Sequence, residues 1–387
     1  MIKFKFTTSD ELQEIYKKEI ISRTKQRMAD FILTIPAPHT EKFKQYFHDL
    51  KIEKILNCEP GELLHYIDEV YLTLPVLADR YWPSLLLRGV PVPENIKEFG
   101  ARTAKEKEVL EVIYQETKAF LKGLVSDDKH YLAWLLAKLK SANTSSDKRK
   151  ILKLILGTSQ GNTRATEDYL KIFPDWVNDF SDVFNYPELS AKIGHDIVDE
   201  WKIDVCLYCN QEPIQTQGKR VKYRTDLDHF YPKTKFPFLA VTLSNLIPSG
   251  KICNQSYKKN QDMIDYAHPF VDGVNDSSLF YLDIPPGEKV TESNFKVKVS
   301  KQDTNLDFNL TGFEIEYNYG NSNELKSWVS NAHGMVEIIL SLNEPNMQST
   351  LLDSLVNTKK PAHNERQKKF KADSINQFAN RKLVSYP

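Results

Sequence analysis

Three of the four cysteines in this 387-residue chain lie between residues 206 and 253, and only Cys58 is remote from them. Cys206 and Cys209 have the spacing at which two thiolates can grip one tetrahedral zinc ion. The same spacing also occurs in redox sites, so it does not decide the chemistry alone. Four cysteines are too few for a disulfide framework, which favours a reducing compartment, the cytoplasm. The clustering therefore constrains one short stretch to fold so that its thiols meet.

Composition sets the outer limits of what the chain can be. The length suggests two or three domains of roughly 150 residues each, and 41% hydrophobic residues suffice for real cores. Lys plus Arg and Asp plus Glu both number 52, which excludes a wholly basic, histone-like protein but not a local basic surface. The start of the chain lacks the apolar run of a signal peptide, and no stretch approaches the ~20 apolar residues of a membrane span. We expect a cytoplasmic protein that does not bind membranes.

The hydrophobic pattern predicts an α+β protein in three parts. Residues 1–200 are predicted to form a helical region that serves as a scaffold, binds a partner or regulates activity. Their periodicity predicts helices over residues 11–31, 40–56, 103–124, 148–156 and 188–201. Thr103 is the expected cap of the third helix, and Gly157 the expected stop of the fourth. From residue 201 to 270 the chain changes to short strands, turns and clustered His, Cys, Asp and Asn.

Residues 271–387 form the third part, a mixed α/β region. Its pattern predicts strands over 279–284, 295–299 and 306–319, and helices over 323–342 and 348–358. The tail over 359–382 carries eight Lys or Arg against Glu365 and Asp373, a net charge of +6. A solvated or frayed helix and a phosphate-contacting role both remain open for this tail.

Two further motifs lie among the clustered cysteines. The first is Asp226-Leu-Asp228-His229-Phe-Tyr-Pro-Lys233, in which an alternating strand from Val221 ends before the proline. An acidic residue beside a histidine at a strand end can pair a metal ligand with a general base. The second runs from Ser244-Asn245-Leu-Ile-Pro to Cys253-Asn254-Gln-Ser-Tyr-Lys258-Lys259. A short basic helix there would turn Asn254 back toward the strand end.

Taken in order, these motifs resemble the HNH endonucleases, the ββα-metal finger nucleases. The likeness covers residues 206–259. The sequence around Asp228 and Asn245 is most similar to that of bacterial anti-phage defence proteins, namely the HNH components of Septu-type and retron-linked systems. The resemblance implies an HNH finger at 201–270, between the helical region at 1–200 and the mixed region at 271–387.

The resemblance also implies a role for each matching residue. His229 corresponds to the general base, and its unperturbed pKa of ~6.5 suits proton acceptance from water. Asp228 and Asn254 correspond to the ligands of a catalytic Mg²⁺ or Mn²⁺, for which oxygen donors are suitable. Asn245 corresponds to the residue that ties the loop by backbone hydrogen bonds. Asp226 is a rival metal ligand, because neighbouring side chains of a regular strand point to opposite faces.

Local charge favours a nucleic-acid partner, with DNA as the expected substrate. Basic residues gather around the motif, at Lys219, Arg220, Lys222, Arg224, Lys233 and Lys235. We expect Lys233, Lys251, Lys258 and Lys259 to contact phosphates.

The sequence departs from the family at one position. Relatives carry Cys-x2-Cys twice, whereas the third cysteine position is Gly250 in this chain. Structural zinc takes four ligands, and Cys206, Cys209 and Cys253 supply three. Either a fourth comes from elsewhere, with His268 the nearest spare candidate, or packing holds the finger without zinc.

The leading hypothesis is a metal-dependent DNA endonuclease of anti-phage defence, controlled by a partner such as an ATPase. One alternative is a catalytically inactive nucleic-acid-binding finger, and another is an RNase toxin on the same finger. Cutting of both strands by a single-site finger requires a homodimer or two successive cuts, and the sequence leaves both open.

Overall fold

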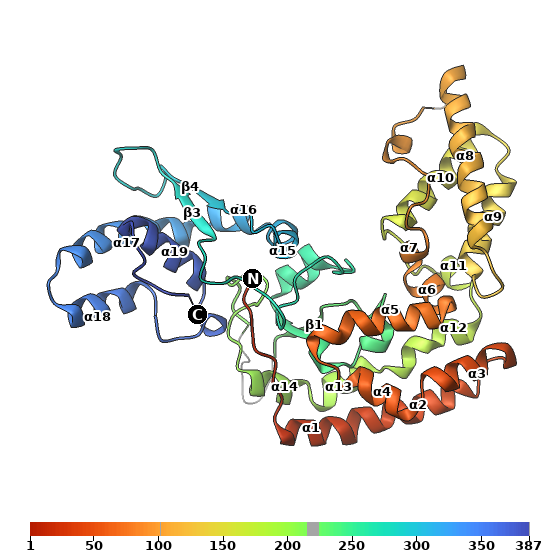
Figure 1. Ribbon diagram of the computed structural model, residues 1–387, viewed down its shortest axis with the longest axis horizontal. Helices are drawn as coiled ribbons and strands as arrows, with labels where there is room; N and C mark the ends of the chain where they lie inside the picture. Colours follow the sequence, from red (N-terminus) through yellow and green to blue (C-terminus); the bar gives the residue numbers. More distant parts are fainter. Residues whose placement is uncertain (101, 215–223, 387) are drawn as a thin grey trace.

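The computed structural model describes residues 1–100, 102–214 and 224–386, which form helices and two small antiparallel sheets (Figure 1). The predicted mixed α+β class is therefore confirmed. In Figure 1, α8, α9 and α10 form an arm that extends away from β1, and a lobe containing β3, β4 and α17 to α19 lies on the other side of β1. In the described part of the chain, no helix is long and apolar enough to cross a membrane.

The first predicted helix, over 11–31, is present as a continuous helical rod. It consists of α1 (Asp10–Tyr16), a π-helical turn (Lys17–Ile21) and α2 (Ser22–Ile32). Ser9 caps it by accepting a hydrogen bond from the backbone N–H of Leu12.

Two other predicted helices are each split in two. Residues 40–56 fall in α3 (Ala37–Tyr46) and α4 (Asp49–Leu56), and 188–201 in α13 (Tyr186–Lys192) and α14 (Gly194–Trp201). The first break turns the ring of Phe47 into a cluster with Phe43 and Phe180. At the second break, a Cβ on Gly194 would lie only 2.8 Å from the Nε of Arg224, so glycine permits this close approach. Aromatic packing and a distant arginine thus decide where these helices end.

The arm consists of α8 (Ala104–Leu124), α9 (His130–Ser141) and α10 (Ser145–Ser159). Thr103 caps α8 as predicted, and Glu106 completes the capping box. The predicted stop of α10 at Gly157 is wrong, because the helix continues to Ser159. The remaining helices of the first part are α5 (Leu63–Thr73), α6 (Pro75–Tyr81), α7 (Pro83–Leu86), α11 (Glu167–Leu170) and α12 (Asp175–Asp179).

The predicted site segment folds as a strand pair followed by a helical turn. Strand β1 (Asp226–His229) pairs antiparallel with β2 (Leu246–Ser249), with His229 opposite Leu246. A π-helical segment, Ile252–Lys258, follows at once. The predicted start of β1 at Val221 lies outside the described residues.

In the third part, β3 (Phe280–Asp283) pairs antiparallel with β4 (Lys296–Val299), close to the predicted strands. The helices α17 (Asn323–Ser341) and α18 (Pro345–Leu355) also match the prediction. The predicted strand over 306–319 is wrong, since this stretch forms α15 (Leu306–Gly312) and α16 (Ile315–Gly320). Leu306, Leu310 and Phe313 are buried at helical spacing.

The basic tail contributes a helix to the core, while its cations Lys359, Lys360, Arg366, Arg381 and Lys382 are exposed. Its helix α19 (Lys368–Ala379) packs against β3 and α17. Lys369 pairs with Asp373 at 2.8 Å, and Phe370 is fully buried. A solvated or frayed helix is therefore the wrong description of α19.

One hydrophobic core runs through all three parts of the chain, from Met1 to Tyr386. The first residues lie beside the cysteine segment, where the N–H of Ile2 donates to the carbonyl of Leu207 at 2.9 Å. From the other side, the N–H of Asp204 donates to the carbonyl of His363 at 2.9 Å. Sequence-distant segments thus hold the site segment in place.

Candidate functional site

The three clustered cysteines meet as the spacing predicted. The sulfur atoms of Cys206, Cys209 and Cys253 lie within 4.8 Å of one another, and all three residues are buried and not disulfide-bonded. The backbone N–H groups of Gln211 and Glu212 donate to the sulfur of Cys209 at 3.4 and 3.5 Å. Because converging sulfurs and inward N–H groups suit a bound thiophilic cation, these residues fit zinc.

Electrostatics within the cluster favour one thiolate. The pKa of Cys209 is lowered well below its usual value, because its sulfur accepts hydrogen bonds from Cys206, Cys253 and the neighbouring backbone. Burial raises the pKa of Cys206. A metal ion would take the place of the shared thiol protons, so its binding would release protons.

His268, the residue predicted as a possible fourth zinc ligand, packs against aromatic rings. Its ring lies against Phe230 at 4.3 Å between centroids and tilts toward Phe270 at 5.4 Å. Its Nδ1 accepts a hydrogen bond from the N–H of Phe270. His268 is absent from the cysteine cluster, so the prediction of a fourth ligand at this residue is not supported.

The predicted general base, His229, is the last residue of β1. Its Nε2 contacts the carbonyl oxygen of Ala240 at 2.8 Å, and a carbonyl can only accept. Nε2 therefore carries the hydrogen, and Nδ1 keeps its lone pair. Burial lowers the pKa of His229 to about 3, with Lys233 and Lys258 adding to the effect. The imidazole is thus neutral near pH 7, and its Nδ1 keeps a lone pair but is a weaker base in this buried state than in free histidine.

Asn245 makes the loop-tying hydrogen bonds that the resemblance implied. Its Oδ1 accepts from the N–H of Tyr231 at 2.8 Å, and its Nδ2 donates to the carbonyls of Tyr231 and Leu239 at 3.0 and 3.1 Å. The side chain is fully buried. Asn245 therefore braces the loop that carries Ala240, the partner of His229.

The side chain of Asp228 is held by other groups than those that contact the His229 ring. Its Oδ2 accepts a 2.7 Å hydrogen bond from the hydroxyl of Tyr208, and its Oδ1 lies 3.1 Å from Nζ of Lys258. Burial raises the pKa of this carboxyl group, while Lys258 and Tyr208 oppose the shift. Both oxygens of this predicted metal ligand are engaged by protein groups.

Lys258 is the clearest correction to the predicted site. Its side chain is only 1% exposed, and its Nζ also donates to the carbonyl of His229 at 2.7 Å. A surface contact with phosphate does not fit this position. The reason is electrostatic, since the buried Asp228 requires a buried counter-charge.

Of the other predicted ligands, Asp226 lies on the same side of β1 as Asp228, as alternation requires. Asp226 accepts a 3.4 Å hydrogen bond from Gln255 of the π-helical segment. Asn254 of that segment is half-buried. The structure thus gathers Asp226 and Asp228 beside the segment that carries Asn254, and directs His229 toward Tyr186, 4.4 Å away between ring centroids.

Of the predicted phosphate contacts, Lys233, Lys251 and Lys259 are exposed. Lys233 lines a cavity of about 610 Å³ together with Arg80 and with Tyr186 and Ala240, the two contacts of His229. Lys219, Arg220 and Lys222 lie outside the described residues. A cavity lined by Lys233 and Arg80 therefore lies beside Tyr186 and Ala240, which contact the ring of His229.

Sequence reasoning missed Tyr208, Tyr186, Ala240 and Glu212. The sequence could have identified Tyr208, because this residue lies between the two cysteines in a segment that must pack tightly. It could not have identified Tyr186 or Ala240, since Tyr186 belongs to a distant helix and Ala240 acts through its backbone.

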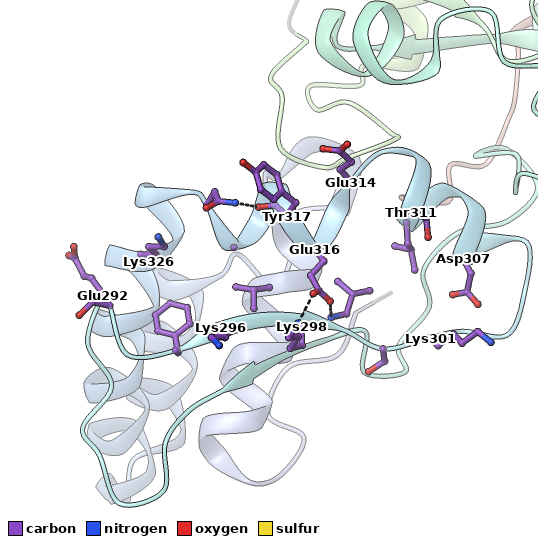
Figure 2. Close-up of a pocket in the computed structure, with 18 residues that line it drawn as sticks. Glu292, Lys296, Lys298, Lys301, Asp307, Thr311, Glu314, Glu316, Tyr317 and Lys326 are labelled. Carbon is purple, nitrogen blue, oxygen red and sulfur yellow. Dashed lines mark hydrogen bonds and ion pairs between the residues drawn. The ribbon is translucent and has the colours of Figure 1, made fainter. Parts of the chain in front are cut away.

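A second hollow, of about 810 Å³, lies between β4 and the α15–α16 segment (Figure 2). Four Lys and four Asp or Glu residues line it, so their charges balance in number. Nζ of Lys298 lies 2.8 Å from Glu316, which also accepts from the N–H of Val299.

No family model, curated protein or solved structure matches the chain. The site is therefore interpreted from its own geometry.

Proposed function

We propose that this chain is a metal-dependent endonuclease of the HNH type that hydrolyses phosphodiester bonds of DNA. The observation that carries the proposal is the hydrogen bond of His229 to the Ala240 carbonyl, which leaves Nδ1 of a neutral imidazole as proton acceptor. The order of strand, Asn245-braced loop, strand and helical segment supports it.

Each residue has a role in the proposal. His229 takes the proton of the attacking water. Asp228 and Asn254 offer carboxylate and amide oxygens to Mg²⁺ or Mn²⁺, which when bound stabilises negative charge on the phosphate and the leaving oxygen. Lys258 competes for the Oδ1 atom of Asp228, so its ammonium must release this oxygen to a cation.

Plasmid cleavage tests the proposal. Purified protein is incubated with plasmid DNA in Mg²⁺, in Mn²⁺ and in EDTA, alongside the variants His229→Ala and His65→Ala. His65 is an exposed histidine of α5 and serves as the matched control. We expect cleavage that needs the metal, is lost in His229→Ala and persists in His65→Ala. Equal cleavage by wild type and His229→Ala would reject the proposal.

A specific observation favours a second candidate, a non-catalytic nucleic-acid-binding module. The buried pair of Asp228 and Lys258 already neutralises the predicted metal ligand. DNA binding without cleavage in either metal would support this candidate, and cleavage of RNA alone would support an RNase.

The family resemblance extends the proposal to anti-phage defence with a regulatory ATPase. A neighbouring ATPase or reverse transcriptase gene would support this extension.

A further inference from the structure

A second hollow, of about 190 Å³, adjoins the cavity beside Tyr186 and Ala240. The residues that line both are Arg80, Tyr81, Ala165 and Thr234. Because they share these residues, the two hollows together form one basic groove. This groove leads from the contacts of His229 to the loop between α10 and α11.

The basic groove lies where the helical region meets the loop between β1 and β2. Gly161, just after α10, has a left-handed backbone, and a Cβ on it would lie 3.2 Å from Nζ of Lys235. Arg164 and Ala165 follow in the same loop, and Arg80 comes from the end of α6. Residues far apart in the sequence thus line opposite sides of the groove.

Positive charge is in excess in the basic groove. Among the described residues, its lining cations are Arg80, Arg164, Lys233 and Lys235, against Asp182. Nζ of Lys235 lies 3.9 Å from Asp262. The groove therefore suits a ligand with several negative charges.

Two of these cations are held by uncharged groups. The Nε of Arg80 donates to the amide oxygen of Asn178 at 2.7 Å, and Nζ of Lys233 lies 4.8 Å from the ring centroid of Tyr186. Burial lowers the pKa of both Lys233 and Lys235. An anion in the groove would stabilise both ammonium groups, since a nearby opposite charge favours the charged form.

The groove continues into the arm. A third hollow, of about 380 Å³, shares Thr163, Arg164 and Tyr169 with it and reaches Trp134 and Lys153. The Oγ1 atom of Thr163 is buried and has no hydrogen-bond partner among the described residues. A path of this extent fits a chain of phosphates better than a single phosphate.

We infer that the basic groove binds the phosphate backbone of a single DNA strand and leads this strand past His229. Proteins that bind single strands use a positively charged groove that follows one backbone. A double helix is too wide to enter a hollow of about 190 Å³. The inference deepens the proposed function and rests on it only for the position of the scissile phosphate near His229.

The first experiment measures binding of a fluorescent single DNA strand of about 20 nucleotides by anisotropy. Full-length protein is used in EDTA, which prevents metal-dependent cleavage. Arg164→Ala should weaken binding at least about five-fold and reduce the slope of log affinity against log salt by about 0.7, because one phosphate contact is lost.

Arg102→Ala is the matched control. Arg102 is an exposed arginine before α8 and does not line the groove, so its variant should bind as wild type does. Absence of strand binding by wild type, or wild-type affinity and salt slope in Arg164→Ala, would overturn the inference.

Competition identifies the form of the ligand. The unlabelled single strand should displace the probe, whereas the same strand in a duplex, a mononucleotide and inorganic phosphate at equal phosphate concentration should displace it far less. Equal displacement by inorganic phosphate or by the mononucleotide would show a site for one phosphate and reject the strand. Stronger displacement by the duplex would also reject it.

Photo-cross-linking locates the strand without any substitution. A strand with a photoreactive base should cross-link to the peptide that contains residues 161–166. Cross-links confined to other surfaces would refute the groove.

Failure of the groove and failure of the proposed function give different results. A protein that binds the strand through Arg164 but cleaves no DNA would reject the nuclease and leave the groove standing. Metal-dependent cleavage together with unchanged strand binding in Arg164→Ala would reject the groove and leave the nuclease standing.

Discussion

At the scale of single residues, the site depends on groups that are buried in one specific charge state. His229 is neutral, because burial disfavours its imidazolium form. Asp228 is held against Lys258, and the two side chains are 6% and 1% exposed. Such groups make the protein sensitive to any change that leaves one of them without its partner.

The ion pair predicts a strong effect of Lys258→Met. Removing the ammonium leaves Asp228 buried and unpaired, which should lower the free energy of unfolding by about 3 to 5 kcal/mol. Urea denaturation measures the loss. Asp228→Asn combined with Lys258→Met should recover most of it, and an additive double-variant cycle would contradict the pairing.

The same variant tests whether a cation can replace Lys258. Mn²⁺ should restore about 1 to 3 kcal/mol to Lys258→Met when present at roughly ten to a hundred times its Kd. It should have no effect on the double variant, which lacks the carboxylate. Equal stabilisation of both variants would show that Mn²⁺ binds elsewhere.

Two buried histidines predict the pH dependence of stability. Burial lowers the pKa of both His229 and His268 to about 3, whereas the unfolded chain titrates near 6.5. Between these values the unfolded state binds more protons, so stability falls as the pH drops. Each histidine contributes a slope of about 1.4 kcal/mol per pH unit.

Urea denaturation between pH 6.5 and 4.5 measures this slope. His268→Phe keeps an aromatic ring among Phe230 and Phe270 and should remove one histidine's share. A slope unchanged by the substitution would show that His268 is not held neutral by the fold.

At the scale of elements, the loop between β1 and β2 is the part on which the site depends most. Asn245 ties this loop by three side-chain hydrogen bonds, and the N–H of Phe230 donates to the Asn245 carbonyl at 2.8 Å. The loop in turn presents the Ala240 carbonyl to His229. Loop order and the tautomer of His229 are therefore coupled.

Asn245→Ala should destabilise the protein by about 3 kcal/mol, because it leaves buried backbone groups of the loop without partners. Asn245→Asp keeps the acceptor but turns a buried carboxylate oxygen toward the carbonyls of Tyr231 and Leu239, and should be at least as destabilising as Asn245→Ala. Asn162→Ala, at an exposed loop position, should change stability by less than ~0.5 kcal/mol. Thermal and urea unfolding compare the variants, and a neutral Asn245→Ala would contradict the brace.

At the scale of the whole molecule, the cysteine segment is held between distant parts of the chain. Asn210 has a left-handed backbone, with φ of 54°. Its Nδ2 donates to the carbonyls of Ala362 and Glu365, and its Oδ1 accepts from the N–H of Lys368. One side chain thus joins the cysteine turn to the start of α19.

Asn210→Gly should separate this connection from the backbone requirement. Glycine accepts the left-handed conformation but loses the three side-chain hydrogen bonds, so we expect a loss of about 2 to 4 kcal/mol. Hydrogen exchange should speed up around both the cysteine turn and the start of α19. Faster exchange in only one of them would contradict the coupling.

The sequence by itself determined those features that depend on neighbouring residues. Local periodicity located α8 and its Thr103 cap, and motif spacing located the converging thiols of Cys206 and Cys209. The loop-tying bonds of Asn245 were also expected, on the strength of the family resemblance. Each of these signals lies within a short stretch of chain, because helix caps and turns are local structures.

Only the tertiary structure decided which charged groups lie inside and what fills each space. The sequence predicts Lys258 as a surface cation, whereas in the structure it is buried against Asp228 and the carbonyl of His229. The stretch over 306–319 alternates like a strand but forms two helices, because its apolar residues find their partners at helical spacing. From the sequence, Gly250 marks a missing side chain, whereas in the structure the side chain of Glu212 occupies that space. Burial and charge pairing depend on segments distant in sequence, so no local pattern encodes them.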